Sequence, residues 1–330
     1  MDYRPAIIDA LDTLRKRDLA NKEPFKARAY QNVLSQIKQL AHPIQSEADL
    51  AGITGMGEQI SKKLKEIFAT GQLKTAEKAK ELYHMDALDA FQKIYGVGPA
   101  KATQLVEQGY RTIADLRTDP KAPLNDKQVI GLKYYEALLD RIPREEMLEH
   151  EDIVKHYIKN AELVGSFRRR AETSGDIDVL IRIPTLTTPK EAKKQLAELV
   201  QRLKVSKYII EVLALGEHKC MAICRTAESA MPRRLDLLMI PEHQYGSALL
   251  YFTGSDRFNV SFRQHALHRG YTLNEYGLTQ VNAEVRAVPS LSSEKDLFHF
   301  LGLEYVEPWE RTTMLLKLKV RPPIINVAAK

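Results

Sequence analysis

The sequence predicts a multidomain α+β fold in which helical modules come first and a mixed β-sheet follows. Its 330 residues suggest about two domains at roughly 150 residues each. Apolar residues recur at helical spacing through the first part of the chain, whereas short runs rich in β-branched residues begin near residue 177. We expect four modules, over residues 1–85, 86–145, 146–245 and 246–330.

Two helices are expected at the N-terminus. Apolar side chains recur at helical spacing over residues 7–19 and again over residues 33–40, and Pro43 ends the second segment. The first module is therefore predicted to be built from short helices.

A small motif occurs twice in the helical part. Ile53-Thr-Gly55-Met-Gly57 and Ile94-Tyr-Gly96-Val-Gly98 lie 41 residues apart, each with a leucine seven positions after its second glycine. Glycine permits a tight turn and lets N–H groups of the following helix approach a phosphate. The alternative is that each Gly-x-Gly only caps a helix. The duplication resembles a pair of helix-hairpin-helix motifs, which implies that Gly55, Gly57, Gly96 and Gly98 grip a nucleic-acid backbone, with Na⁺ or K⁺ on hairpin carbonyls.

A β-sheet is predicted in the third module. Residues 177–183, 207–215 and 234–240 are rich in β-branched and apolar side chains. Between the first two runs, residues 189–203 are lysine-rich with apolar side chains at helical spacing, so they should form a helix that covers one face of the sheet. After Gly246 the segments are mixed and rich in aromatic residues, which predicts a small α/β end.

Acidic side chains mark the first and last of these runs. In an extended strand Asp176 and Asp178 point to one face about 6.5–7 Å apart, so their like charges need a cation. Carboxylate oxygens favour Mg²⁺ or Mn²⁺, and two ions about 3.5–4 Å apart suit in-line phosphoryl displacement. Asp236 lies inside an apolar run, where an uncompensated carboxylate is costly, which makes it the candidate third ligand. The alternative is a buried salt bridge to Arg233 or Arg234.

A phosphate-binding segment precedes the carboxylates. Gly165-Ser166 supplies a tight turn and a hydroxyl, and Arg168 and Arg169 supply guanidinium donors suited to a triphosphate. The order Gly-Ser, arginine pair, Gly-Asp-Ile-Asp is the nucleotidyltransferase signature, and in this form the chain resembles the family X DNA polymerases.

The resemblance covers nearly the whole chain. Four further motifs follow the family in order and approximate spacing: Gly131-Leu-Lys-Tyr-Tyr135, Arg141-Ile-Pro-Arg144, Tyr251-Phe-Thr-Gly-Ser-Asp-Arg-Phe-Asn259 and Ser293-Glu-Lys-Asp296. No stretch is left over for a BRCT domain, so we expect a short member. It would comprise helical lyase and thumb modules, a nucleotidyltransferase palm with a mixed sheet, and an α/β C-terminal subdomain.

The resemblance implies a role for each matching residue. Asp176 and Asp178 would bind two Mg²⁺ ions, for which Mn²⁺ can substitute, and Asp236 would bind the catalytic ion and help to activate the primer 3′-hydroxyl. The dNTP would be held by Arg144, Ser166, Arg169 and Gly175 at its phosphates, by Tyr251, Phe252 and Gly254 at its sugar, and by Asp256 and Asn259 at its base. Arg234 would contact the primer phosphate, Arg263 the template, and Glu275 would support the closed state. For Tyr251 and Phe252 the alternative is core packing.

The first module resembles the family's 5′-deoxyribose phosphate lyase domain. This implies a Schiff-base nucleophile at Lys63, with Lys26 and Tyr30 near the 5′ phosphate. An amine nucleophile needs a lowered pKa, which a nearby cation such as Lys62 can help to produce. The position of Lys62 is usually acidic in the family, so the alternative is that both lysines form a solvated basic face that contacts DNA.

Three functions compete. The leading one is a templated DNA polymerase that fills short gaps in base excision repair. Arg263 and the absence of a long insertion between residues 179 and 236 argue against a template-independent terminal transferase. The three aspartates argue against a non-catalytic DNA-end binder. Leu238 stands where the family pattern has an arginine, which leaves the metal set intact but alters how Asp236 is restrained.

The composition narrows partners and compartment. A net charge of +6 and a pI near 9.0 favour a polyanion, here gapped or nicked DNA, with dNTP as substrate. Cys220 and Cys224 offer no second ligand pair, so neither zinc nor a disulfide is expected. No run reaches the roughly 18 apolar residues of a membrane helix, so no membrane partner is expected. We expect a monomer, nuclear if the protein is cellular; a viral or mitochondrial version would look alike.

Overall fold

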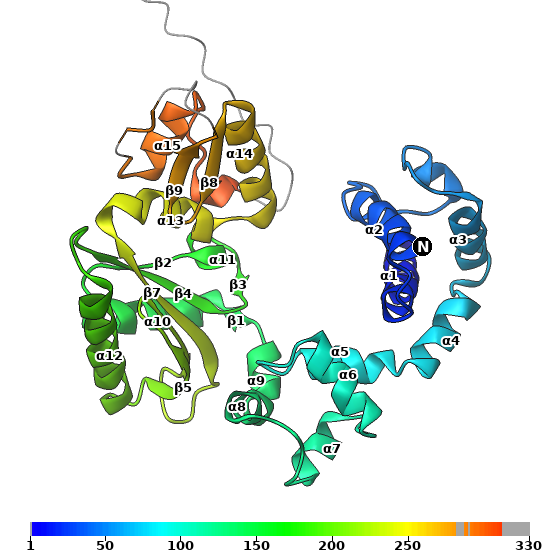
Figure 1. Cartoon of the computed structure of the whole chain (residues 1–330), viewed down its shortest axis with the longest axis horizontal. Helices are drawn as coiled ribbons and strands as arrows, with labels where there is room; N and C mark the ends of the chain where they lie inside the picture. Colours follow the sequence, from blue (N-terminus) through cyan, green and yellow to red (C-terminus); the bar gives the residue numbers. More distant parts are fainter. Residues whose placement is uncertain (1, 282–286, 290, 312–330) are drawn as a thin grey trace, which may run out of the picture. The chain divides into compact units, whose positions relative to one another are not determined.

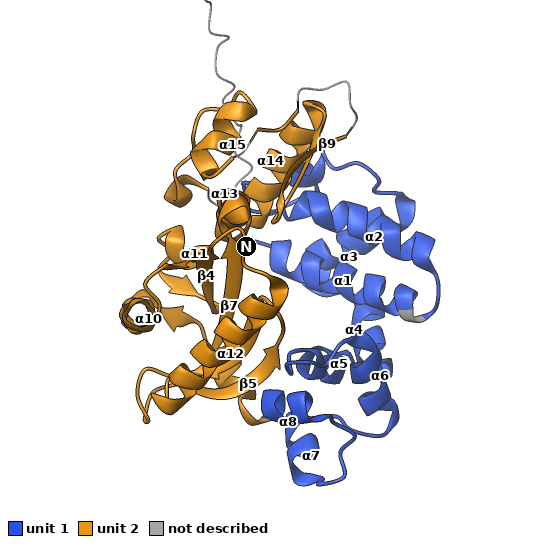
Figure 2. Ribbon diagram, turned by 60° about the vertical axis from the view of Figure 1, so that its left-hand side comes forward, with its two compact units in different colours: residues 1–132 blue, residues 133–330 orange. Residues whose placement is uncertain are grey.

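The computed structural model describes residues 2–281, 287–289 and 291–311 (Figure 1). The chain forms two compact units, residues 1–132 and 133–330 (Figure 2). This division into two units is coarser than the four modules expected over residues 1–85, 86–145, 146–245 and 246–330.

The secondary structure of unit 1 consists of helices joined by turns and loops, with no strand among its described residues. Its elements are α1 (Arg4–Ala20), α2 (Pro24–Ile37), a short 3₁₀ helix η1 (Glu47–Leu50), α3 (Glu58–Thr70), α4 (Lys74–Leu82), α5 (Met85–Gln92), α6 (Pro99–Glu107), α7 (Ile113–Thr118) and α8 (Asp126–Lys133). The core of the first module is formed by the apolar stripes of α1, α2 and α3, among them Leu11, Leu34 and Leu64. The second predicted helix starts earlier than expected, at Pro24, because proline suits the first turn of a helix.

Both Gly-x-Gly turns have the same backbone form. The first glycine of each, Gly55 and Gly96, has a positive φ, of 79° and 81°. The second glycine is extended and is the N-cap of the following helix, with Gly57 preceding α3 and Gly98 preceding α6. Each turn therefore leads straight into a helix N-terminus, as the duplicated pattern predicts.

Unit 2 contains a five-stranded sheet with the order β2-β4-β7-β6-β5. The strands are β2 (Ala161–Leu163), β4 (Ile177–Ile183), β5 (Ile209–Leu215), β6 (Lys219–Cys224) and β7 (Arg233–Pro241). Only the central pair, β4 with β7, runs parallel among these five, so the sheet is mixed. The second predicted run starts two residues late, at Ile209, because Lys207 has a φ of +64° and cannot continue a strand.

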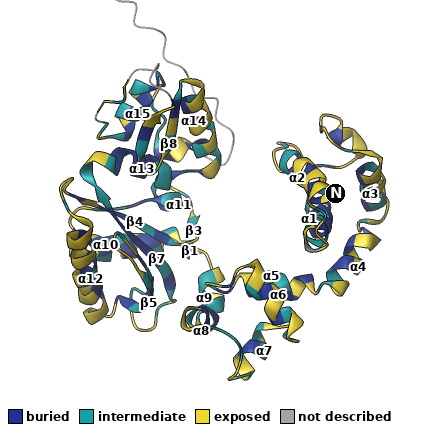
Figure 3. Ribbon diagram, viewed as in Figure 1, coloured by how far each residue is buried: buried dark blue, intermediate teal, exposed yellow. Residues whose placement is uncertain are grey.

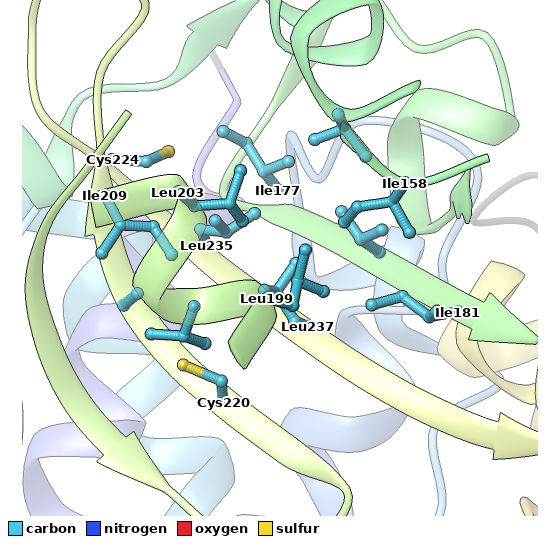
Figure 4. Packing of buried hydrophobic residues seen from close by; sticks show 14 of the residues in the cluster. Ile158, Ile177, Ile181, Leu199, Leu203, Ile209, Cys220, Cys224, Leu235 and Leu237 are labelled. Atoms are coloured by element: carbon cyan, nitrogen blue, oxygen red, sulfur yellow. The ribbon is translucent and has the colours of Figure 1, made fainter. Parts of the chain in front are cut away.

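Two helices cover one face of this sheet. They are α10 (Arg144–Tyr157) and α12 (Pro189–Val205), and α12 matches the helix predicted over 189–203. Leu199 and Leu203 of α12 pack on Ile177, Leu235 and Leu237 in the largest core cluster (Figure 4). In Figure 3 the strands of the sheet are coloured mostly as buried, whereas the outer side of α12 is coloured as exposed. Alternation along the strands therefore sends Asp178 and Asp236 to the opposite face.

The remaining elements of unit 2 flank the sheet. They are α9 (Tyr135–Leu139), the short pair β1 (Ile142–Pro143) and β3 (Thr173–Ser174), α11 (Gly165–Arg168), η2 (Glu242–Gln244), α13 (Tyr245–Thr253), α14 (Asp256–His268), the hairpin β8 (Tyr271–Asn274) and β9 (Gly277–Gln280), α15 (Glu294–Phe300) and η3 (Pro308–Glu310). Tyr245 and Ala248 of α13 pack against Leu180 and Leu238 on the second face of the sheet. A separate cluster, which includes Phe258, holds α14, α15 and the hairpin together. None of the helices described is long and apolar enough to cross a membrane.

Candidate active site

Two of the predicted acids face each other in the centre of the sheet. Asp178 of β4 is the direct register partner of Asp236 of β7. Because partners in a parallel pair point to the same side, the two carboxylates share the face that α12 leaves free. The sequence pattern placed Asp176 inside a strand with Asp178. In the structure Asp176 lies instead in the bend just before β4. The acids nevertheless come together at one end of the parallel pair.

Electrostatics at this point are unfavourable for three free carboxylates. Burial and, after it, the neighbouring charges of Asp176 and Asp236 together raise the pKa of Asp178 to about 7, although Arg234 and Lys219 oppose the change. A side chain at position 165 would crowd the site, because a Cβ on Gly165 would lie 3.2 Å from Asp178 Oδ2. This close approach accounts for the glycine before Ser166.

Basic side chains partly neutralise the acids. Arg234 donates a hydrogen bond from Nη2 to Asp176 Oδ2. Lys219 of β6 places its Nζ 2.8 Å from Asp236 Oδ2, and the Asp236 side chain is only 6% exposed. The other oxygen of that carboxylate, Oδ1, is buried without a hydrogen-bond partner. The buried salt bridge considered for Asp236 is thus present in part, but its direct partner is Lys219, and Arg234 Nε lies 3.9 Å from Oδ1.

The donor set suits a hard divalent cation. Within the described part of the chain, no three Asp, Glu, His or Cys side chains are already arranged to hold a metal ion. The three carboxylates offer oxygen ligands only, and the unpartnered Oδ1 of Asp236 is a buried acceptor of the kind that a cation would satisfy. The residues present therefore fit a divalent ion that displaces the basic partners.

A pocket of about 670 Å³ opens beside the acids. It is lined by Gly165, Arg169, Asp178, Tyr251, Phe252, Gly254, Ser255, Asp256, Arg257, Asn259, Val260 and Arg263. Eight of these were predicted as site residues from the sequence, and Asp178 joins the pocket to the carboxylate group. Of the other four, Gly165 was expected to form the tight turn before Ser166, whereas Ser255, Arg257 and Val260 were given no role, because nothing in their residue type distinguishes them.

Hydrogen bonds fix the side chains around the pocket. Arg169 donates from Nη1 to the carbonyl of Thr253 at 2.5 Å, at the end of α13. Asn259 donates to the carbonyl of Tyr251 at 2.8 Å. The Arg263 guanidinium stands over the Tyr251 ring, 5.2 Å from its centroid. Tyr251 and Phe252 are both half-buried: Phe252 packs against the cluster that includes Leu180, and its ring meets the Tyr251 ring edge-on with centroids 5.1 Å apart.

Of the residues predicted to bind phosphate, Ser166 lies near the carboxylates and Arg144 does not. Ser166 donates to the Ser174 hydroxyl at 2.9 Å, close to the carboxylate end of the sheet. The structure does not bring Arg144 to the pocket: its guanidinium stacks on Phe167 at 4.7 Å and donates to the Phe167 carbonyl. Arg141 was not singled out, yet its Nη1 lies 3.8 Å from the position of a Cβ on Gly175. Arg141 is therefore the arginine beside the Gly175 turn.

Arg168 serves a different purpose from its neighbour. It donates to both oxygens of Glu294 at 3.1 and 2.9 Å and to Glu162 at 2.8 Å. Glu294 also accepts from Arg311, whose side chain is fully buried. This network ties α11 to α15, and sequence reasoning missed the contact between Arg168 and Glu294 because the two residues lie 126 positions apart.

The predicted lyase residues lie in the helical unit. Lys63 on α3 is half-buried, and burial, followed by the charge of Arg17, lowers its pKa. Lys62 is exposed and pairs with Glu58 at 2.7 Å. Tyr30 is buried on α2, and Lys26 is exposed and pairs with Glu23. Of the two lysines, Lys63 has the environment that favours a neutral amine.

Four family models together match most of the chain. They are a helix-hairpin-helix domain over residues 2–73, the fingers domain of DNA polymerase lambda over 89–139, the DNA polymerase beta palm over 141–242 and the DNA polymerase beta thumb over 248–312. The name thumb thus belongs to the C-terminal segment, and the helical module to which the sequence analysis gave that name matches a fingers domain.

Curated relatives carry related names. DNA polymerase lambda of Rattus norvegicus is 32% identical over 94% of this chain and 56% of its own length. DNA polymerase lambda of Arabidopsis thaliana is 30% identical over 88% of this chain and 58% of its own length. The DNA polymerase type-X family protein pol4 of Schizosaccharomyces pombe is 28% identical over 93% of this chain and 64% of its own length. The chain therefore spans about three fifths of these relatives.

Proposed function

This chain belongs to family X of the DNA polymerases, and from that premise we propose that it is a template-directed polymerase that fills short gaps in DNA. The proposed substrates are gapped or nicked DNA and dNTPs. The observation that carries the proposal is the register of Asp178 with Asp236, beside a pocket lined by Arg169, Tyr251 and Asn259. The proposed setting is base excision repair, with a monomer working in the nucleus.

Asp176, Asp178 and Asp236 would hold two Mg²⁺ ions, for which Mn²⁺ can substitute. Such ions supply charge neutralisation for the triphosphate and lower the pKa of a bound hydroxyl. Asp236 would accept a hydrogen bond from the primer 3′-hydroxyl and so point its oxygen at the α-phosphorus. As the 3′-oxygen forms its new bond to the α-phosphorus, it would give up its proton to Asp236. The bond from the α-phosphorus to the oxygen that bridges to the β-phosphate would break, and pyrophosphate would leave. Arg234, freed from Asp176, would meet the primer phosphate.

The pocket residues would orient the dNTP. Arg169 and Ser166 would hold the β and γ phosphates, which need charged or hydroxyl donors. The half-buried rings of Tyr251 and Phe252, which meet edge-on, would contact a sugar without a 2′-hydroxyl. Arg263, whose guanidinium lies over the Tyr251 ring, would contact the template strand. Arg144 lies outside the pocket and supports the turn after α11. The phosphate contact that the sequence analysis gave to Arg144 is proposed instead for Arg141, which lies beside Gly175.

A primer-extension assay tests the polymerase activity. The substrate is a duplex with a one-nucleotide gap, offered beside a single strand of the same sequence. We expect incorporation of the complementary nucleotide at the gap, with loss of at least about a thousandfold in rate for Asp236→Asn, because a charged ligand is removed from the reacting centre. Lys193→Met, an exposed change on α12, is the matched control. Equal extension of the single strand would instead support a terminal transferase.

A second activity is proposed for the helical unit. Lys63 would attack the C1′ aldehyde of a 5′-deoxyribose phosphate and form a Schiff base with loss of water, and β-elimination would then release the 5′ phosphate of the DNA. The lowered pKa of Lys63 supports this assignment, because the neutral amine is the nucleophile. The hairpins at Gly55, Gly57, Gly96 and Gly98 would bind the DNA backbone, with Na⁺ or K⁺ on their carbonyls.

Borohydride trapping on a 5′-deoxyribose phosphate substrate tests the lyase assignment. Wild-type protein and Lys62→Ala should become covalently attached to the labelled DNA, and Lys63→Ala should not. Trapping that survives in Lys63→Ala and disappears in Lys62→Ala would move the nucleophile to Lys62. Absence of trapping in the wild type, with DNA binding intact, would leave the basic face as a DNA contact only.

A further inference from the structure

Lys219 occupies a position from which one side chain controls the third carboxylate. It is the first residue of β6, and it pairs in register with Leu238 of β7, while Met221 pairs with Asp236. Register partners in an antiparallel pair point to the same face, so Lys219 lies diagonally across from Asp236. A lysine is long enough to span that diagonal, and here it does so.

The contact is close, and it is formed at a carboxylate with few other options. Nζ of Lys219 lies 2.8 Å from Oδ2 of Asp236, whose side chain is 6% exposed, whereas the Lys219 side chain is 44% exposed. Arg234, the other nearby cation, is 3.9 Å from Oδ1 and gives its hydrogen bond to Asp176. Leu238, on the same face, has no group that could donate. The direct charge partner of Asp236 is therefore a side chain that can also reach solvent.

We propose that Lys219 is a positioning residue that acts as an electrostatic latch on Asp236, and this inference rests on the metal-dependent function proposed above. Without a divalent ion, the ammonium holds Oδ2 and compensates a buried carboxylate whose other cation, Arg234, lies 3.9 Å from Oδ1. A divalent ion that takes Asp236 as ligand must displace the ammonium, which then swings to solvent on its flexible stem. The affinity of the protein for the ion is thus lowered by the strength of this ion pair.

Mn²⁺ titration of the protein alone, followed by loss of the free-ion electron paramagnetic resonance signal, tests the latch without reference to catalysis. Lys219→Met should bind Mn²⁺ roughly fivefold more tightly than wild type, which is the size expected for removal of a partly exposed competing pair. Lys219→Arg keeps the cation and should stay close to wild type. Lys193→Met removes an exposed charge elsewhere on the unit and should change nothing. Mn²⁺ should also raise the melting temperature more in Lys219→Met than in wild type.

The sign of the change separates the latch from a structural role. If Lys219 served only to hold Asp236 in place for the metal, Lys219→Met would bind Mn²⁺ more weakly. Unchanged or weaker binding in folded Lys219→Met therefore overturns the proposal, and Lys219→Gln gives the same reading if the methionine variant does not fold. Asp178→Asn reports on the parent function: if it binds Mn²⁺ as wild type does, the metal site itself is elsewhere and the latch falls with it. Loss of binding in Asp178→Asn with no gain in Lys219→Met defeats the latch alone.

Discussion

His150 lies in the interior of the palm and makes the stability of that unit depend on pH. Its side chain is fully buried on α10, with Nδ1 2.9 Å from the Tyr208 hydroxyl and Nε2 3.6 Å from Glu146. Cys224 Sγ lies 4.0 Å from Nδ1, and Arg233 holds Glu146 through two hydrogen bonds of 2.6 and 2.7 Å. With Glu146 already engaged by Arg233, a protonated imidazole would find little compensation.

The size of the effect follows from the pKa. Burial lowers the pKa of His150 from 6.5 to about 4, although Glu146 opposes the change. Above pH 6.5 the imidazole is neutral in the folded and unfolded states alike. Between pH 6.5 and 4 only the unfolded chain takes up the proton, so the free energy of unfolding falls as the pH falls. At about 1.4 kcal/mol per pKa unit, the loss is about 2 kcal/mol at pH 5 and about 3 kcal/mol at pH 4.

Urea unfolding at pH 7.5 and pH 5.0 measures this loss. The fluorescence of Trp309, the single tryptophan of the chain, reports on unit 2. Carboxyl groups with a lowered pKa, such as Glu294, also lose stabilising effect as the pH falls, and they do so in every variant. The comparison is therefore between wild type and His150→Asn: wild type should lose about 2 kcal/mol more than the variant. Two parallel pH profiles, equal within about 0.5 kcal/mol, would refute a neutral buried imidazole.

Three further predictions test other parts of the structure. Glu294→Gln should lower the free energy of unfolding of unit 2 by about 3 kcal/mol, because the fully buried Arg311 loses its counter-charge; an unchanged thermal melt of Trp309 fluorescence would contradict this. Gly131→Ala should destabilise unit 1 by about 1–3 kcal/mol, since its Cβ would lie 2.7 Å from the Tyr95 carbonyl oxygen; urea unfolding followed by circular dichroism measures it, and a change below about 0.5 kcal/mol would argue against the close packing. Gly57→Ala should leave stability unchanged, because a Cβ there meets nothing within 4 Å and φ is −66°. It should nevertheless weaken DNA binding severalfold in fluorescence anisotropy if the helix N-terminus binds a phosphate. An affinity of Gly57→Ala equal to that of wild type, at low and at high salt, would contradict that phosphate contact.

Much of the palm could be predicted because its signals are local. The helix expected over 189–203 is observed as Pro189–Val205, since its apolar spacing repeats regularly enough to define one buried stripe. An acid inside the apolar run of β7 indicated a compensated site, and the structure places Asp236 opposite Asp178. The spacing of apolar residues and the energetic cost of burying a carboxylate are both properties of a short segment, so they can be recognised before the fold is known.

The contact partners of individual arginine and lysine side chains could not be predicted in the same way. Arg168 and Arg169 are adjacent, and successive residues on a helix point about 100° apart; one therefore meets Glu294 while the other lines the pocket. Which of the two faces the pocket depends on how α11 packs against α13 and α15. The contact from Lys219 to Asp236 depends on the register of β6 with β7, which only the assembled sheet determines.

The side-by-side pairing of β4 with β7 also governs where this protein can change in length. Residues 184–232 leave the sheet centre after one acid and return before the other, and they begin with a largely exposed turn at residues 184–187, outside the strands. Extra residues in that turn would extend a surface loop at small entropic cost and leave the spacing of the two acids untouched. A single residue gained or lost within either central strand would instead rotate one acid to the side covered by α12. Insertions and deletions are therefore expected in the surface turns of the palm rather than in its two central strands.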